Sequence, residues 1–206
     1  MTTRNALVAL SDATQVERVV ERLAGDGINV ALVGDATVPG AALVVAPHER
    51  STAVARVAKE FGSLDILVTD VVSPAPRRFT ESDPADWFSA VHSALSLPFS
   101  LIRAAVHELT GGADARIVVV GHGWASSDDE DSTASAAVQG AAVALVKTLA
   151  RDLGSAGITV NEVTIPTDPA SYAGAIASAV GYLVSPLAGA TTGQILTAGS
   201  GGEIRP

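Results

Sequence analysis

The chain of 206 residues contains no cysteine, which excludes disulfide bonds and thiolate chemistry. Aromatic residues are scarce at 4%, and charged residues make up only 17% against 48% hydrophobic residues. Positive charge is scarcest, because 13 lysines and arginines stand against 22 aspartates and glutamates and leave a net charge of −9. This acidity argues against nucleic acid or an anionic membrane surface as a partner.

Long apolar runs are also missing. The apolar run in the opening segment MTTRNALVAL is too short for a secretory signal. No stretch reaches the ~18 continuous apolar residues of a membrane span. We therefore expect a soluble, cytoplasmic protein. The apolar content is mostly alanine, valine and leucine, which suits a parallel sheet under alanine-rich helices. The length predicts one compact domain over residues 1–206.

Short valine-rich runs alternate along the chain with longer helical patterns, as in βαβ units. This predicts an α/β fold with one doubly wound, Rossmann-like parallel sheet of about seven strands. The segment DATVPG between the second and third runs is too short for a helix, so the second crossover is shortened. The expected strands are 6–10, 29–34, 41–46, 65–69, 116–121, 158–164 and 194–198, and the expected helices are 14–26, 51–61, 84–109, 133–155 and 171–184.

Two of the expected helices are apolar on nearly every side. Residues 136–146 read AAVQGAAVALV, and the helix that ends near Leu109 includes VHSALSLPFSLIRAAV. Such helices are usually covered on every side. The second cover is either a neighbouring part of the same domain or another subunit, and we favour a subunit interface because a doubly wound sheet leaves the outer helix faces open. The candidate interface residues are Phe99, Ile102, Val138, Ala142, Leu145, Val146 and Leu149.

Residues 145–161, LVKTLARDLGSAGITVN, resemble a short-chain dehydrogenase/reductase of the 3-oxoacyl-carrier-protein reductase type. The resemblance covers nearly the whole chain and implies the family's fold and its use of NAD(P). The other segments that carry it, in order, are RNALVAL, VERLAGDGINVALVG, EFGSLDILV, LPFSLIRA, RIVVVG and TGQILTAGSGG.

The family binds its dinucleotide with a Thr-Gly-x-x-x-Gly-x-Gly turn, which aligns with residues 9–16. Its three glycines correspond to Leu10, Thr14 and Val16. Glycine lets the backbone turn tightly and bring its N–H groups to the pyrophosphate. We expect these three side chains to crowd the phosphate position and Asp12 to repel it. The stretch then reads as an ordinary loop with Asp12 or Thr14 as helix N-cap, and no cofactor is expected; NAD(P) is the alternative.

Two further segments belong to the same comparison. Asp35 follows the second strand, where the resemblance implies that an acidic residue holds the adenine ribose. It is a weak candidate for cofactor binding, and we interpret it as a solvated loop residue. Residues 69–72, Thr-Asp-Val-Val, stand in place of the family's Asn-Asn-Ala-Gly.

The resemblance also assigns four catalytic positions, and this chain has changed all of them. The tyrosine and lysine correspond to Ser135 and Gln139, the serine to His122 and the asparagine to Ala94. An aliphatic hydroxyl is a much weaker acid than a phenol, and a neutral amide does not lower its pKa. Lys147 is two helical turns too far along the helix to substitute.

A replacement site is conceivable around His122, which precedes an acidic run that begins at Asp128. A histidine oriented by an aspartate can act as an acid and base. The simpler interpretation, which we favour, is a loop histidine near acidic residues that complement the next helix dipole. The remaining histidines have no metal-ligand spacing, so we expect no metal. The family's substrate-covering segment after the sixth strand is shortened to IPTDPASYAGAIASAV.

The resemblance implies that the two long helices pair across a two-fold axis. Because the pairing helices remain and the catalytic residues do not, we expect a non-catalytic subunit that pairs with and stabilises an active NAD(P)H-dependent 3-oxoacyl (ketoacyl) reductase. The resemblance suggests that this reductase acts in fatty-acid or polyketide synthesis, an inference by analogy alone. The alternatives are a homo-oligomer, an active ketoreductase with atypical residues, and a cofactor-free enzyme that uses His122.

Overall fold

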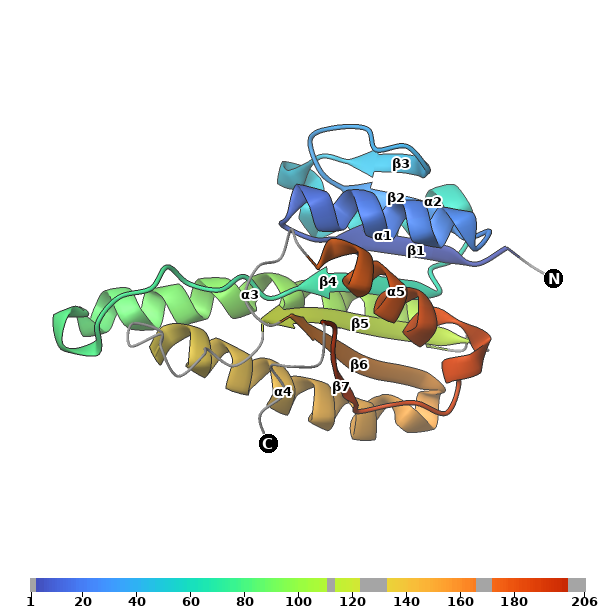
Figure 1. The fold of residues 1–206 in the computed structure, drawn as a ribbon. Coiled ribbons are helices and arrows are strands. Elements are labelled where there is room, and N and C mark those ends of the chain that lie inside the picture. Colours follow the sequence, from blue (N-terminus) through green and yellow to red (C-terminus); the bar gives the residue numbers. More distant parts are fainter. Residues whose placement is uncertain (1–2, 111–113, 123–132, 166–171, 200–206) are drawn as a thin grey trace.

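The computed structural model describes residues 3–110, 114–122, 133–165 and 172–199. One parallel sheet runs through it in the order β3-β2-β1-β4-β5-β6-β7 (Figure 1). The strands are β1 (Asn5–Ala9), β2 (Asn29–Val33), β3 (Ala41–Val45), β4 (Ile66–Asp70), β5 (Ala115–His122), β6 (Ile158–Ile165) and β7 (Ile195–Thr197). The predicted seven-stranded, doubly wound fold is therefore confirmed.

Helices cover both faces of the sheet. Helices α1 (Ala13–Gly25) and α5 (Ala173–Val184) lie on one face, and α2 (Ala53–Phe61), α3 (Pro84–Leu109) and α4 (Thr133–Leu153) lie on the other (Figure 1). Each face has its own apolar cluster, built from alternate residues of the strands. The strand order reverses between β1 and β4, and ligands of open α/β sheets bind at this place, beyond the carboxyl ends of the strands.

The shortened second crossover is also confirmed, since no helix lies between β2 and β3. The turn closes with a hydrogen bond from the Ala41 N–H to the Val38 carbonyl, and Gly40 has a φ of 94° that favours glycine. After β3, a 3-10 helix (Pro47–Thr52) precedes α2, so α2 begins two residues later than predicted. Pro47 occupies the first turn of that 3-10 helix, where its missing N–H costs nothing.

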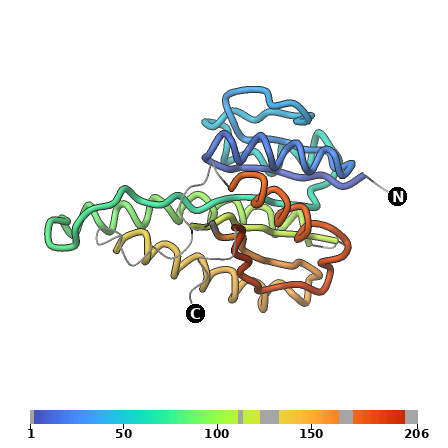
Figure 2. The backbone as a smooth tube through the Cα atoms, viewed as in Figure 1, coloured from blue at the N-terminus to red at the C-terminus, as the bar shows by residue number. Residues whose placement is uncertain are grey.

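Helices α3 and α4 are long, and their N-terminal parts extend beyond the carboxyl ends of the strands (Figure 2). The side chain of Asp83 caps α3 by accepting from the N–H groups of Ala85 and Asp86, and Pro84 takes the first helical position. By length and composition both helices could cross a membrane, a test that core helices of globular proteins also pass. Here each helix packs one face on the sheet.

That packing corrects part of the predicted interface. Four of the seven candidates belong to the buried cluster between the helices and the sheet, so they do not reach the outer surface: Ile102, Val138, Ala142 and Val146. The helical period places them on the inner face, which an all-round apolar pattern does not reveal. Phe99 is 55% exposed, and Leu145 and Leu149 are half-buried.

Candidate functional site

A cavity of about 250 Å³ lies where the strand order reverses, at the carboxyl ends of β1, β4 and β5. Three segments contribute its polar groups: the turn between β1 and α1, the end of β4, and the end of β5. Its lining residues are Ser11, Asp12, Gln15, Asp70, Val72, Ser73, Val120 and His122.

The turn between β1 and α1 is an ordinary helix entry. Asp12 is the N-cap of α1, and its Oδ1 accepts a hydrogen bond of 2.8 Å from the Gln15 N–H. No residue of this turn has a positive φ, so the turn does not require glycine. Leu10 and Val16 are each 7% exposed and pack in the core beside α1, whereas Thr14 is exposed. None of the three lines the cavity, so the expectation that their side chains crowd the phosphate position stays a prediction.

What closes the turn is a carboxylate from β4. The Ser11 N–H donates to Asp70 Oδ2 at 2.7 Å, and the Ser11 hydroxyl donates to Asp70 Oδ1 at 3.4 Å. An amide of this turn, of the kind that binds a phosphate in a dinucleotide site, is thus paired with an internal anion. Asp70 is 7% exposed; burial raises the pKa of its carboxyl, and the hydrogen bonds from Ser11 oppose that rise.

Gln15 is a buried polar residue that sequence reasoning missed. It lies in the first turn of α1, is 2% exposed and lines the cavity. Among the residues that the structure describes, its side-chain amide has no hydrogen-bond partner. Buried amides are normally paired, so this group has donors and an acceptor available toward the cavity.

His122 ends β5 and also lines the cavity. Burial lowers the pKa of its imidazole, and the nearby Asp70 carboxylate opposes that shift. The net lowering from an already near-neutral value favours the uncharged ring at pH 7. The carboxylate beside His122 is therefore Asp70, whereas the predicted partner Asp128 lies outside the described residues.

The position of the family's tyrosine lies at the edge of this site. The Ser73 hydroxyl, which lines the cavity, donates to Ser135 Oγ at 2.7 Å, and the Ser135 hydroxyl donates to the Pro74 carbonyl at 3.2 Å. Ser135 is therefore held in a hydrogen-bonded chain. Ala94, at the asparagine position, belongs to the inner face of α3 and packs in the core.

The position of the family's lysine is buried against an acid. Gln139 Nε2 donates to Glu162 Oε1 at 2.6 Å, and the Glu162 side chain is fully buried in the middle of β6. Burial raises the pKa of Glu162 to about 7, partly opposed by the hydrogen bond from Gln139. A Cβ at Gly121 would lie 2.1 Å from Glu162 Oε1, so glycine makes room for this carboxyl. The buried carboxyl could have been found in the sequence, because a glutamate stands inside ITVNEVT, a central parallel strand that should be apolar.

The two other predicted features have different places. Asp35 is exposed just after β2 and is not among the lining residues of the cavity, in line with a solvated loop residue. The connection from β6 to α5 comprises residues 166–172, of which the structure describes the last. The substrate-covering segment therefore falls largely outside the described residues.

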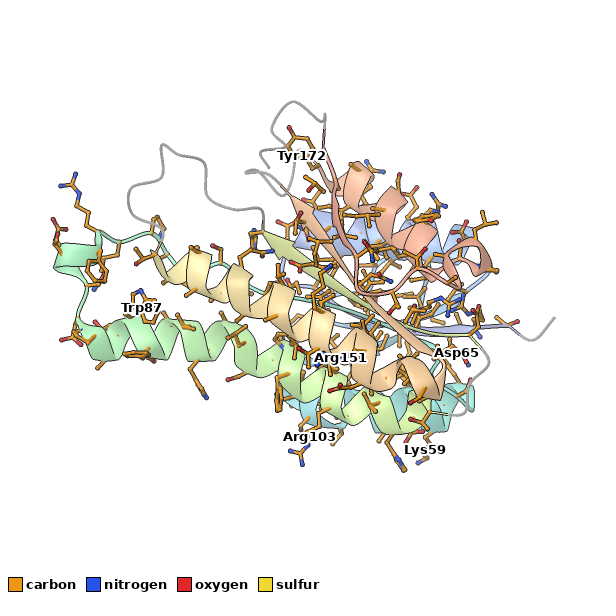
Figure 3. All side chains as sticks on the ribbon, turned by 90° about the horizontal axis from the view of Figure 1, so that it is seen from below. Lys59, Asp65, Trp87, Arg103, Arg151 and Tyr172 are labelled. Carbon is orange, nitrogen blue, oxygen red and sulfur yellow. The ribbon has the colours of Figure 1, made fainter. Side chains whose placement is uncertain are left out.

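A second, apolar groove of about 340 Å³ lies between the outer faces of α3 and α4. Figure 3 shows the two helices side by side, with Trp87 near the first turn of α3 and Arg103 pointing away from the protein. The Trp87 indole N–H donates to the Thr133 hydroxyl, which ties the far ends of the two helices together. The groove is lined by His92, Leu95, Ser96, Phe99, Ala141 and Leu145.

Chemically, the cavity supplies two carboxylates, hydroxyls, an amide and an imidazole. Among its described lining residues there is no lysine, arginine or tyrosine. A pyrophosphate would therefore meet the charges of Asp12 and Asp70 without a compensating cation. These residues do not fit the phosphate part of a dinucleotide.

Comparisons with known proteins show that the chain is similar to reductases and dehydrogenases. A family model described as "Enoyl-(Acyl carrier protein) reductase" matches residues 1–167. The 3-oxoacyl-(acyl-carrier-protein) reductase FabG of Vibrio cholerae is 28% identical over 186 residues, which cover 79% of this chain and 76% of the relative. BbsC of Thauera aromatica, a subunit of a (2S)-((R)-hydroxy(phenyl)methyl)succinyl-CoA dehydrogenase, is 28% identical over 209 residues, or 92% of this chain and 80% of the relative.

Solved structures show the same fold. A short-chain dehydrogenase/reductase from Serratia marcescens superposes with a TM-score of 0.81 at 25% identity and covers 94% of both chains. Acetoin dehydrogenase from Enterobacter cloacae superposes with a TM-score of 0.81 at 20% identity over 100% of both chains.

Proposed function

The chain belongs to the short-chain dehydrogenase/reductase family, and from that premise we propose that it is a non-catalytic, cytoplasmic subunit of a ketoreductase-type oxidoreductase. In this role it pairs with an intact NAD(P)H-dependent 3-oxoacyl reductase and stabilises it. The observation that carries the proposal is the hydrogen bond from the Ser11 N–H to Asp70, which places an internal anion at the turn where a dinucleotide's phosphates would bind.

The catalytic positions support the same proposal. Proton donation to a carbonyl needs an acidic hydroxyl near a positive charge, and this chain has Ser135 and Gln139 at those positions. Gln139 is engaged by Glu162, so the group that replaces the lysine contacts an acid instead of carrying a positive charge. No described residue lining the cavity replaces the missing charge.

The outer groove between α3 and α4 supports pairing. Phe99 is more than half exposed there, and a phenylalanine of this exposure beside Leu95 and Leu145 forms an apolar patch of the kind found at subunit interfaces. Among the relatives, BbsC is named as a subunit of a dehydrogenase, so a chain similar to this one works within an assembly.

A second candidate is an active NAD(P)-dependent oxidoreductase with atypical cofactor and catalytic contacts. The comparisons favour it over the first candidate, because the relatives are named as reductases and dehydrogenases. It requires dinucleotide binding without the glycine turn and proton transfer without tyrosine or lysine.

Titration with NADPH and NADH, followed by nicotinamide fluorescence, separates the two candidates. For a non-catalytic subunit we expect no saturation up to about 1 mM, the upper end of ordinary KM values. Saturable binding in the micromolar range would establish the second candidate in its place. An intact family reductase measured in parallel is the positive control.

Co-expression tests pairing directly. An intact short-chain reductase encoded beside this chain is expected to co-purify with it and to gain thermal stability from it. Phe99→Asp, which adds a charge to the groove, should abolish co-purification. Ala55→Asp adds the same charge at an exposed position of α2 and should have no effect. If Phe99→Asp leaves the complex intact, the groove is not the pairing surface. If the chain forms a homodimer and does not bind the reductase, the proposed hetero-oligomer is wrong and the chain is a homo-oligomer.

A further inference from the structure

We propose that the cavity at the ends of β1, β4 and β5 is a binding site for a small organic cation, whose amidinium or ammonium group contacts Asp70 and Asp12. This inference goes beyond the pairing role, because a subunit without cofactor or catalytic residues can still bind a ligand. It rests on the charge of the cavity, the free hydrogen-bonding capacity of its groups, and its size.

The charge of the cavity is negative. Asp12 and Asp70 both line it, and no lysine or arginine does among the lining residues that the structure describes. Burial lowers the pKa of His122, so the ring adds no positive charge at neutral pH. A cation relieves the cost of burying the Asp70 carboxylate, whereas an anion increases it.

The carboxylates have acceptor capacity left. Each oxygen of Asp70 accepts one hydrogen bond from Ser11, and a carboxylate oxygen can accept two. One oxygen of Asp12 accepts from the Gln15 N–H, and its other oxygen has no hydrogen bond within the described part of the chain. A planar amidinium can donate to both oxygens of one carboxylate at once.

Gln15 provides the independent observation that a ligand belongs here. Its amide is 2% exposed and lines the cavity, and no described residue pairs with it. Its donors and its acceptor are therefore available to a ligand with a polar edge. A natural ligand can use this amide through a second polar group, but the contact with the carboxylates does not require one.

The volume limits the ligand. At about 250 Å³ the cavity is slightly smaller than typical sites for drug-sized molecules, which span about 300–1,000 Å³. It suits a compact fragment and is too small for a whole dinucleotide. A benzamidinium ion, with about nine non-hydrogen atoms, has the right size and charge for a probe.

Three probes of nearly the same shape test the charge preference: benzamidine as cation, benzamide as neutral molecule and benzoate as anion. Isothermal titration calorimetry of the purified chain at pH 7.5 should show saturable benzamidine binding with a Kd below about 10 mM. Benzamide should bind more weakly, and benzoate should not bind. Benzoate binding as tight as benzamidine binding, or no saturation with benzamidine, would overturn the proposal.

Matched variants locate the binding. Asp70→Asn keeps an acceptor for the Ser11 N–H but removes the charge, and it should weaken benzamidine at least tenfold without changing benzamide. Asp12→Asn keeps the helix cap, because asparagine caps as well as aspartate, and it should weaken benzamidine several-fold. Glu17→Gln, on the exposed face of α1, is the control and should bind like the original chain. If Asp70→Asn does not fold, Asp12→Asn decides; unchanged affinity in the variants that fold would refute the site.

Discussion

Replacing Glu162 by glutamine should stabilise this protein at alkaline pH and have a smaller effect at acid pH. The Glu162 side chain is fully buried in β6, and burial raises its pKa from an ordinary 4.5 to about 7. Glutamine has the same shape and no charge. Its amide can accept from Gln139 Nε2 and donate to Gln139 Oε1, an atom that has no partner in the structure.

The sign and size follow from proton linkage. Because the folded pKa lies above the unfolded value, the folded state holds the proton more tightly. The stabilisation is complete below pH 4.5, declines as the pH rises, and is lost above about pH 7. A shift from 4.5 to about 7 corresponds to about 3 kcal/mol in all, of which between about 2 and 3 kcal/mol is lost between pH 5 and pH 8.

Urea unfolding followed by far-ultraviolet circular dichroism measures this difference. The gap in unfolding free energy between Glu162→Gln and the original chain should widen by about 2–3 kcal/mol from pH 5 to pH 8. Glu60→Gln, at an exposed position of α2, should show a gap that changes by less than about 0.5 kcal/mol. An equal gap for Glu162→Gln at both pH values would show that this carboxyl is not held protonated, and the account of the Gln139–Glu162 pair would fail.

Two further predictions follow from close contacts and capping. Gly121→Ala should lower the unfolding free energy by about 1–3 kcal/mol, because its Cβ would lie 2.1 Å from Glu162 Oε1. Gly181→Ala should change it by less than about 1 kcal/mol, because the atoms nearest the new methyl belong to the end of the long, partly exposed Arg22 side chain, which can shift with its exposed partner Asp26. Thermal and urea unfolding of both variants check the contrast, and equal losses would contradict it. Asp12→Ala should cost about 1 kcal/mol through the lost cap of α1 while Asp12→Asn costs little, as measured by urea unfolding; equal costs would mean that the Gln15 N–H does not depend on this cap.

Much of the fold was predictable because its signals are local. Valine-rich runs separated by helical patterns predicted the seven strands and five α-helices within a few residues, and the brevity of DATVPG predicted the missing crossover helix. The helix cap at Asp12 was also predictable, as one of two candidates beside Thr14. These features depend on neighbours in sequence.

The sequence predicted which family residues are absent from the candidate site, but not which contacts its own residues make. The alignment of residues 9–16 and of Ser135 and Gln139 predicted the absent glycines, tyrosine and lysine. It did not show that the side chains of Leu10 and Val16 turn into the core. The hydrogen bond between Ser11 and Asp70 joins residues 59 positions apart, and no local sequence pattern predicts it.

The sequence by itself determined the family, the order of strands and helices, and the absence of the usual reductase side chains, since each is a matter of which residue stands at which position. Only the tertiary structure decided that Asp70 accepts a hydrogen bond from the Ser11 N–H and that Glu162 lies buried against Gln139. It also decided that the side-chain amide of Gln15 has no hydrogen-bond partner among the described residues. These contacts join side chains from different strands and helices, and their burial sets the pKa values and the charge of the site. A chain read residue by residue carries no such distances, because they arise when the sheet brings β1, β4, β5 and β6 side by side.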